Sequence, residues 1–286
     1  MLVVETMRPR QWTKNVFVLA GLVFSGEVLQ PAAQAAAWAV ALSFCLASGA
    51  TYLLNDAGDA STDRLNPRTA SRPVARGDLS PVAARTAAAV SALVALALAA
   101  TVNWESLAVL GGYLAMQIGY SAGLKHVLFV DVMIIAGGFV LRALAGLVAI
   151  ETVISEWLLL CTGLLALFIG LAKRRAETLA GDGRSHPQRP VLDGYSVKLL
   201  DELIAVVTPA ILVVYALYAV IGARAGSVML TTLPFVLYGI FRVLFLIHHR
   251  GGAEEPELIV WQDRPLLVCI LCWALLSGVI GAIAMD

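Results

Sequence analysis

Charged residues are scarce in this chain. Asp, Glu, Lys and Arg make up 14% of its 286 residues, whereas about a quarter of an ordinary soluble domain is charged. Hydrophobic residues reach 59%, and the mean hydropathy is +0.83. This balance excludes a soluble globular domain and predicts a polytopic membrane protein. The formal net charge is zero, so no overall field favours binding to nucleic acid.

Cysteine is also rare, and its placement argues against redox or metal chemistry. All four cysteines, Cys45, Cys161, Cys269 and Cys272, fall inside apolar segments. Cys269 and Cys272 have the spacing of a redox or metal pair. Their flanking residues are nevertheless typical of a bilayer and include no further ligands, so we interpret them as packing residues.

A cleavable signal peptide is a further feature that we do not find. Arg8, Arg10 and Lys14 precede an apolar run that lacks a small-residue cleavage pattern. The first dozen residues mix apolar and basic side chains around Pro9. We therefore expect an interfacial helix that leads into the first membrane span.

Long apolar runs are abundant, and hydropathy predicts nine membrane spans. Several are shorter than the roughly 20 residues that a perpendicular helix needs, so their ends should extend into the polar flanks. Long charged loops follow the second, fourth, sixth and eighth spans, and short loops make the other connections. The nine spans are predicted at residues 14–27, 33–54, 82–102, 106–120, 127–149, 156–172, 202–222, 228–247 and 265–284.

The basic residues outside these spans predict the orientation. Nearly all of them precede the first span or lie in the long loops, whereas Arg224 alone lies on the opposite side. Since cytoplasmic loops carry an excess of Lys and Arg, the N-terminus and the long loops are predicted to be cytoplasmic. The C-terminus is then outside, and the protein is a multi-pass component of the inner membrane.

An acidic run directly after the second span is the most informative feature of the sequence. Residues 55–64 contain Asn55, Asp56, Asp59, Asp63 and Arg64, and hydrocarbon does not tolerate such a cluster without compensation. If the helix continues, Asn55, Asp59 and Asp63 share one face, and Asp56 and Asp63 are one heptad apart. Oxygen ligands in this pattern suit Mg²⁺, which binds through a few carboxylates and substrate phosphates. We predict a cation-bridged diphosphate site at the membrane surface.

Arginines follow the acidic run at short intervals. Arg64, Arg68, Arg72 and Arg76 offer planar guanidinium groups that match phosphate oxygens. The same residues would also satisfy the cytoplasmic bias of basic loops without binding anything. Both interpretations remain open for Arg68 and Arg76.

Two further sets of charged residues point to phosphate binding. Asp131 and Arg142 lie eleven residues apart, about three helical turns, and so share a helix face. Arg142 is either half of a structural ion pair or a phosphate-binding group in a cavity. After the sixth span, Lys173 and Arg174 precede Glu177, either as a cytoplasmic anchor or as a cationic patch for a phosphorylated substrate. The sequence Asp263-Arg264-Pro265 predicts the start of the last helix, with Asp263 as its N-cap.

The pattern Asn-Asp-x-x-Asp-x-x-x-Asp after a second span resembles the first aspartate motif of the UbiA-type intramembrane prenyltransferases. Within that superfamily, the chain is most similar to the polyprenyl-phosphate phosphoribosyltransferase branch. The similarity extends over nearly the whole chain. It includes residues 8–15, Tyr120-Ser121, Leu124-Lys125-His126, Gly138-Phe139 with Leu141-Arg142-Ala143, Lys173-Arg174 with Glu177, and Asp263-Arg264-Pro265.

One departure from the superfamily is informative. Its prenyl-diphosphate users carry a second aspartate-rich motif after the sixth span, whereas this chain has Lys-Arg-Arg-Ala-Glu at residues 173–177. A basic patch suits one metal-bridged diphosphate together with additional phosphates, as in phosphoribosyl diphosphate. The fingerprint of the soluble phosphoribosyltransferases is absent from the sequence.

The resemblance implies an all-α protein, with residues 1–286 as a single UbiA-type transmembrane domain and nine helices around a central cavity open to the cytoplasm. The implied reaction is Mg²⁺-dependent transfer of 5-phosphoribose from phosphoribosyl diphosphate to a polyprenyl phosphate, which serves cell-wall biogenesis. Asp56, Asp59 and Asp63 would be catalytic and would bind Mg²⁺ together with Asn55. The expected substrate-binding residues are Lys14, Asn55, Arg64, Arg72, Tyr120, Lys125, Arg142, Lys173, Arg174, Glu177, Arg189 and Tyr195.

Two alternatives differ in donor or in class. The first is a UbiA-type prenyltransferase that moves a prenyl group from prenyl diphosphate to an aromatic or lipid acceptor, and the missing second aspartate motif argues against it. The second is a transporter or lipid-binding protein with a cytoplasmic cation site. Transporters tend to place polar residues near the midplane in broken helices, whereas here they cluster at one surface.

Overall fold

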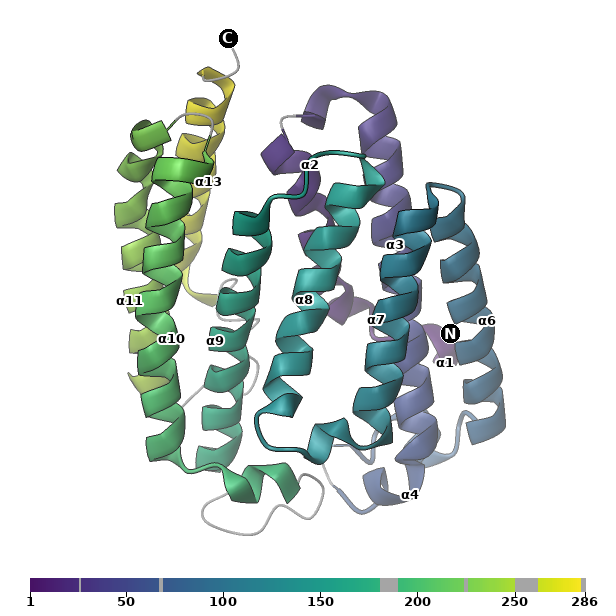
Figure 1. Ribbon diagram of the computed structural model, residues 1–286. Coiled ribbons are helices and arrows are strands. Elements are labelled where there is room, and N and C mark those ends of the chain that lie inside the picture. The colour runs from purple at the N-terminus through teal and green to yellow at the C-terminus, as the bar shows by residue number, and fades with distance from the viewer. Residues whose placement is uncertain (26, 67–68, 181–189, 224–225, 250–261, 284–286) are drawn as a thin grey trace. The chain divides into compact units, whose positions relative to one another are not determined.

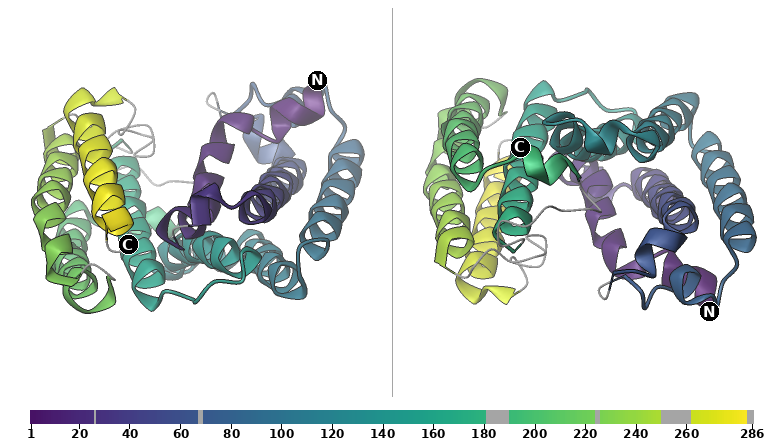
Figure 2. Two further views of the ribbon diagram at one scale, coloured as in Figure 1. Left: turned by 90° about the horizontal axis from the view of Figure 1, so that it is seen from above. Right: turned by 90° about the horizontal axis from the view of Figure 1, so that it is seen from below.

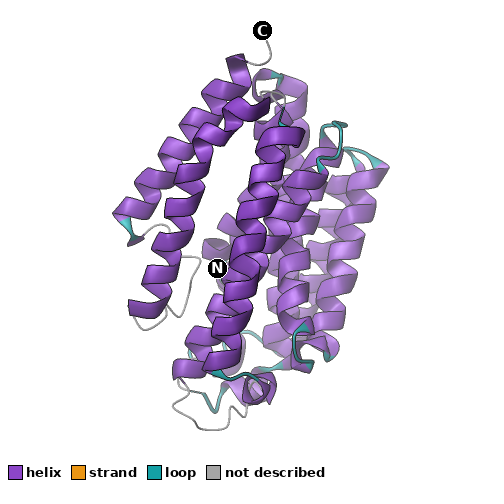
Figure 3. Ribbon diagram, turned by 60° about the vertical axis from the view of Figure 1, so that its left-hand side comes forward, coloured by secondary structure: helices purple, strands orange, loops and turns teal. Residues whose placement is uncertain are grey.

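The computed structural model describes residues 1–25, 27–66, 69–180, 190–223, 226–249 and 262–283. In these ranges every regular element is a helix (Figure 3). The chain forms two compact units, which we describe separately. Unit 1 comprises Met1–Lys125 and Gly138–Ser155, and unit 2 comprises His126–Gly137 and Glu156–Asp286.

Seven helical segments in the described residues are long and apolar enough to cross a membrane. They are Pro31–Gly58, Pro81–Ala100, Val130–Ala149, Glu156–Ala180, Val197–Gly222, Gly226–His249 and Arg264–Gly281. Each coincides with a predicted span. The prediction of a multi-pass helical protein is therefore confirmed, whereas the count of nine is not.

The two other predicted spans have different local structures. The span at 106–120 is a helix, α7 (Trp104–Ala122), but it is not among the seven. The span at 14–27 is divided into a 3₁₀-helix, η1 (Pro9–Leu19), and a short α-helix, α2 (Ala20–Ser25). The predicted interfacial helix corresponds to α1 (Leu2–Thr6).

Unit 1 is organised around α3 (Pro31–Gly58), which packs against α6 (Pro81–Ala100) and η1 (Figures 1 and 2). Small residues make this packing close, since alanines such as Ala47 on α3 and Ala95 on α6 are fully buried. The unit also contains α1, α2, η2 (Glu27–Leu29), α4 (Ala60–Asp63), α5 (Pro73–Arg76), α7, the start of the 3₁₀-helix η3 (Leu124–His126) and the second part of α8 (Val130–Ala149).

Glycines allow α8 and the N-terminal segment to approach each other backbone to backbone. A Cβ atom on Gly146 would overlap the carbonyl oxygen of Val18, and one on Gly21 would lie 2.8 Å from the backbone of Gly146. Larger residues at either position would push the two segments apart. This contact fixes η1 beside α8 within unit 1.

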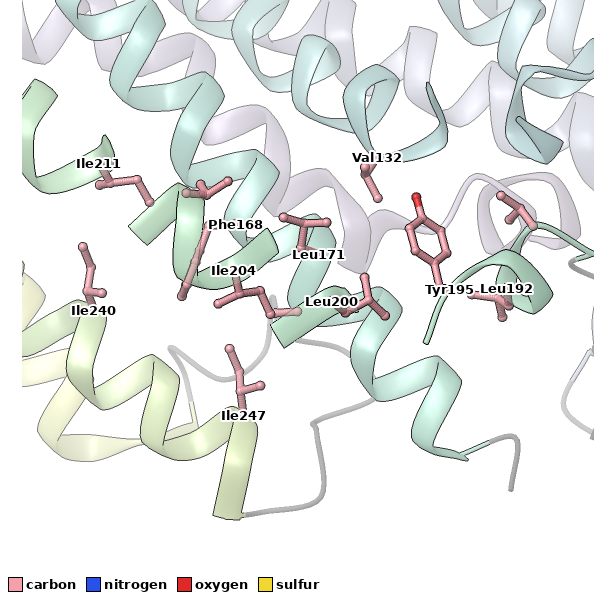
Figure 4. Packing of buried hydrophobic residues seen from close by; sticks show 13 residues of the cluster. Val132, Phe168, Leu171, Leu192, Tyr195, Leu200, Ile204, Ile211, Ile240 and Ile247 are labelled. Carbon is pink, nitrogen blue, oxygen red and sulfur yellow. The ribbon is translucent and has the colours of Figure 1, made fainter. Parts of the chain in front are cut away.

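Unit 2 has an apolar core between α9 (Glu156–Ala180), α10 (Val197–Leu217) and α11 (Leu233–His249). Phe168, Ile204 and Ile247 come from these three helices, and Val132 of α8 and Tyr195 extend the same cluster (Figure 4). The other elements of the unit are the 3₁₀-helix η4 (Pro190–Gly194), the π-helix η5 (Tyr218–Gly222), the 3₁₀-helix η6 (Gly226–Thr232) and α13 (Arg264–Ile283).

Side-chain caps set the starts of several helices. Asp263 accepts a hydrogen bond from the backbone N–H of Leu266 at 3.0 Å, which confirms its prediction as the N-cap of α13. Ser80, Asn103 and Ser196 cap α6, α7 and α10 in the same way. Arg242 of α11 also holds Asp263 through two hydrogen bonds of 3.0 and 2.9 Å.

Candidate functional site

The acidic run lies at the end of α3, where the helix passes into α4 (Figure 1). The N–H of Asp59 donates to the carbonyl of Asn55, and the N–H of Asp63 donates to that of Asp59, both at 2.8 Å. The helical repeat therefore continues beyond Gly58, as the predicted shared face requires. The side chains nevertheless divide into two pairs with different partners.

Asp56 and Asp63, one heptad apart, face the same arginine. Arg72 donates to Asp63 at 2.7 Å and to Asp56 at 3.3 Å. A second guanidinium, that of Arg8, reaches the same Asp56 oxygen at 2.6 Å and lies 4.7 Å above the ring of Tyr52. Because Asp56 is 2% exposed and Asp63 is 7% exposed, both charges are compensated by arginine and not by water.

Asn55 and Asp59 instead face the end of α7. The hydroxyl of Ser121 donates to Oδ1 of Asn55 at 2.6 Å, and Nζ of Lys125 lies 3.7 Å from Asp59. The Asp59 side chain is 46% exposed, so it is the most accessible carboxylate of the run. Tyr120, in the last turn of α7, is half-buried.

The neighbouring arginines have local partners. Arg64 donates to the carbonyl of Ala75 at 2.7 Å and thereby braces α5. Arg76 pairs with Asp78 at 2.5 Å and with Glu5 at 3.5 Å, away from the acidic run. Arg68 lies outside the described residues.

Arg142 is a buried polar centre of unit 1. Its guanidinium donates to Asn15 at 2.7 Å, to the carbonyl of Gly138 at 2.8 Å and to the hydroxyl of Tyr113 at 2.9 Å. The ring of Tyr113 also lies 4.8 Å from the guanidinium carbon. Among the described residues no carboxylate pairs with Arg142, so the ion pair that the sequence left open is not formed there.

Asp131 is the corresponding centre of unit 2. Although Asp131 and Arg142 lie on one helix, Asp131 pairs with Arg174, whose Nε donates to it at 2.7 Å. Tyr195 donates to the other Asp131 oxygen at 2.8 Å and accepts from the backbone N–H of Phe129 at 3.0 Å. Arg174 also contacts Glu177. Arg174 is 2% exposed and Asp131 is fully buried.

Tyr195 is held in its protonated form. Burial raises the pKa of its hydroxyl well above the usual range, and the hydrogen bond to Asp131 raises the pKa further. It therefore remains a neutral donor to Asp131 and connects η4 to the start of α8. Lys173 is half-buried in α9, Lys14 is half-buried in η1, and Arg189 lies outside the described residues.

Comparison with known proteins identifies the family. The sequence profile described as the UbiA prenyltransferase family matches residues 15–262. The chain belongs to the UbiA prenyltransferase family. It is therefore a multi-pass membrane protein with the all-helical fold of that family.

Individual relatives are similar over nearly the whole chain. The chain is 34% identical to the decaprenyl-phosphate phosphoribosyltransferase of Mycolicibacterium smegmatis, covering 98% of this chain and 91% of that protein. It is 33% identical to the protein of the same name from Mycobacterium tuberculosis, covering 96% and 93%. A solved UbiA homologue from Archaeoglobus fulgidus, bound to GPP and Mg²⁺, has a TM-score of 0.73 at 17% identity and covers 99% of this chain and 100% of that chain.

The acidic run could hold a divalent cation only if water and substrate phosphates complete the coordination shell of the ion. In the described part of the chain, no three His, Cys, Asp or Glu side chains are grouped closely enough to hold a metal by themselves. Mg²⁺ does not require such a group, because it usually binds through one or two carboxylates and completes its shell with water and substrate phosphates. The hard oxygen donors of Asn55, Asp56, Asp59 and Asp63 meet that lesser requirement.

Sequence reasoning missed four residues that organise these sites: Arg8, Asn15, Tyr113 and Ser121. Arg8 contributed to the predicted orientation and to the resemblance, and Asn15 and Ser121 contributed only to the resemblance. Their partners are distant in sequence, since 48 residues separate Arg8 from Asp56 and 127 separate Asn15 from Arg142. No spacing rule along one helix connects residues that far apart.

Proposed function

We propose that this protein transfers 5-phosphoribose from phosphoribosyl diphosphate to a polyprenyl phosphate and releases diphosphate. The observation that carries the proposal is the 33–34% identity, over nearly the full length, to relatives named decaprenyl-phosphate phosphoribosyltransferase. The likeness to the UbiA homologue bound to GPP and Mg²⁺, at 17% identity, supports the fold alone.

The donor's diphosphate would bind at the acidic run of unit 1. Asp59 is the accessible carboxylate, and Asn55, Asp56 and Asp63 complete the set of oxygen donors. A divalent cation held there, Mg²⁺ in this proposal, would stabilise the charge that develops on the departing diphosphate.

In the proposed reaction a phosphate oxygen of the acceptor attacks C1 of the ribose. A C1–O bond to the acceptor forms as the C1–O bond to diphosphate breaks, and the electron pair of the broken bond leaves with diphosphate. The acceptor phosphate is already anionic at neutral pH, so the chain need not supply a general base. Its contribution is to hold two anionic groups close together, which requires cations.

We propose two roles for the basic residues around the site. Lys14, Lys125 and Lys173, with Arg8 and Arg72, are proposed to contact substrate phosphates. Arg64, Arg142 and Arg174 are committed to a backbone carbonyl, to Asn15 and Tyr113, and to Asp131, respectively. We assign these three arginines, and Glu177 and Tyr195, to positioning of the site. Tyr120 and Arg189 remain proposed substrate contacts.

We further propose that residues 1–286 form one UbiA-type domain with nine crossings of the inner membrane, a cytoplasmic N-terminus and a central cavity open to the cytoplasm. Because a 3₁₀-helix rises about 2 Å per residue, η1 followed by α2 would reach about 30 Å, the thickness of the hydrocarbon core. This length belongs to residues 9–25, so in this proposal the first crossing begins before the predicted span at 14–27, and α7 would be the other crossing.

A two-donor assay tests the reaction. Purified protein in lipid is given polyprenyl phosphate and phosphoribosyl diphosphate labelled in the ribose, and label is measured in the organic phase. We expect Mg²⁺-dependent appearance of lipid-linked label that EDTA prevents. In parallel, labelled prenyl diphosphate is offered with aromatic acceptors. Label that stays in the aqueous phase in the first arm, together with product in the second, would instead identify a prenyltransferase.

A further inference from the structure

Two guanidinium groups occupy the carboxylates that are proposed to bind metal. Arg8 and Arg72 both contact Oδ1 of Asp56, and Arg72 also contacts Asp63. The two carboxylates carry two negative charges and the two arginines carry two positive charges. These four side chains together therefore carry no net charge. A divalent cation that binds without diphosphate is repelled by the two arginines.

The arginines are better able to move than the carboxylates. The side chains of Arg8 and Arg72 are 31% and 30% exposed, whereas those of Asp56 and Asp63 are 2% and 9% exposed. Arg8 also has a left-handed backbone with φ of 54°, which is uncommon outside glycine. This conformation at the junction of α1 and η1 aims its side chain at Asp56 and Tyr52.

We propose that Arg8 and Arg72 are resident counter-ions that exchange partners when the donor binds. With no donor present they neutralise Asp56 and Asp63. When a metal–diphosphate complex binds, the guanidinium groups turn to the phosphates and release the carboxylates to the metal. This inference rests on the metal–diphosphate site of the proposed function, and it adds Arg8 as a donor-binding residue.

The exchange makes metal and diphosphate binding interdependent. A metal ion alone brings two positive charges next to two guanidinium groups, whereas diphosphate brings the negative charge that these groups need. Each ligand should therefore increase the affinity for the other by the same factor, as linkage requires.

The test measures Mn²⁺ binding to the full-length protein by electron paramagnetic resonance, with and without inorganic diphosphate. We expect wild-type protein to bind Mn²⁺ weakly alone and about tenfold or more tightly with diphosphate. Arg72→Gln and Arg8→Gln should each bind Mn²⁺ alone about tenfold more tightly than wild type, because removal of one adjacent cation is worth at least one logarithmic unit. Both variants should bind diphosphate more weakly.

Arg76→Gln is the matched control. It removes the same charge from the same region, but Arg76 pairs with Asp78 and Glu5 and does not touch Asp56 or Asp63. Its Mn²⁺ affinity should equal that of wild type. Arg72→Lys keeps the charge and should also resemble wild type, which separates the effect of charge from damage to the fold.

Equal or weaker Mn²⁺ binding by folded Arg72→Gln, or wild-type Mn²⁺ binding that diphosphate does not change, would overturn the exchange. The effect of diphosphate on Mn²⁺ binding is measured on the wild-type protein, so it tests the proposal even if the variants do not fold. If lipid-linked label forms but Mn²⁺ and diphosphate binding are not coupled, the exchange is contradicted and the proposed transferase activity stands. Coupling without lipid-linked label would contradict the transferase alone.

Discussion

Asp59→Asn is expected to lower phosphoribosyl transfer by about a hundredfold or more while the protein stays folded. Asp59 is the exposed carboxylate of the acidic run, and its contact in the described residues is Lys125 at 3.7 Å. An amide keeps the shape of the side chain but removes the charge that holds a divalent cation. Since an exposed ion pair contributes no more than about 1 kcal/mol, the free energy of unfolding should hardly change.

Asp78→Asn is the control for this prediction. Asp78 is 48% exposed and pairs with Arg76, so the substitution removes an equally exposed carboxylate outside the site. Lipid-linked label should form at the wild-type rate in this variant. Mg²⁺-dependent turnover near the wild-type rate in Asp59→Asn would show that Asp59 does not bind the metal. Asp56→Asn is a less specific test, because it also deprives Arg8 and Arg72 of a buried partner.

Asp131→Asn is expected to destabilise unit 2 by about 3 kcal/mol or more. Asp131 is fully buried and accepts hydrogen bonds from Arg174 and Tyr195. The amide would leave the buried guanidinium of Arg174 without the carboxylate that its Nε contacts. Thermal unfolding in detergent should show a lower midpoint than wild type. Tyr195→Phe removes one hydrogen bond and keeps the ion pair, so its effect should be smaller.

The double variant Asp131→Leu/Arg174→Met separates structure from substrate binding. Replacement of both buried charges by apolar residues should recover part of the lost stability, because neither member of the Asp131–Arg174 pair is left as an unpaired buried charge. The recovery is incomplete because Tyr195 loses its acceptor and Glu177 loses its contact with Arg174. If Arg174 acts by positioning, transfer should return in part with stability. A stable double variant with no transfer at all would mean that Arg174 contacts the substrate, contrary to the role assigned here.

The sequence predicted the long elements because their signals are local. Seven of the nine predicted spans correspond to helices that are long and apolar enough to cross a membrane, and Asp263 caps α13 as expected. The first span was predicted as a continuous apolar segment, and hydropathy alone does not distinguish the 3₁₀ geometry of η1 from an α-helix. The position of the acidic run at the end of α3 was also predicted from the residues.

The division of that run into two pairs could not be predicted. Helical spacing places Asn55, Asp59 and Asp63 on one face, but Asp63 turns to Arg72 while Asn55 meets Ser121. Which carboxylate is buried depends on how the segment with Arg72 and the end of α7 pack against the acidic run. These are tertiary contacts, which local spacing does not specify. For the same reason the shared helix face of Asp131 and Arg142 left an ion pair between them open, whereas the structure gives each a separate set of partners.

The most direct test of the account is whether a metal at the acidic run touches the donor's diphosphate. Pulsed electron–nuclear double resonance on Mn²⁺-loaded protein with phosphoribosyl diphosphate measures the hyperfine coupling between Mn²⁺ and phosphorus. We predict a phosphorus coupling in the wild type that persists in Asp78→Asn and disappears in Asp59→Asn. Bound Mn²⁺ without phosphorus coupling, or a coupling that Asp59→Asn leaves unchanged, would contradict the proposed site.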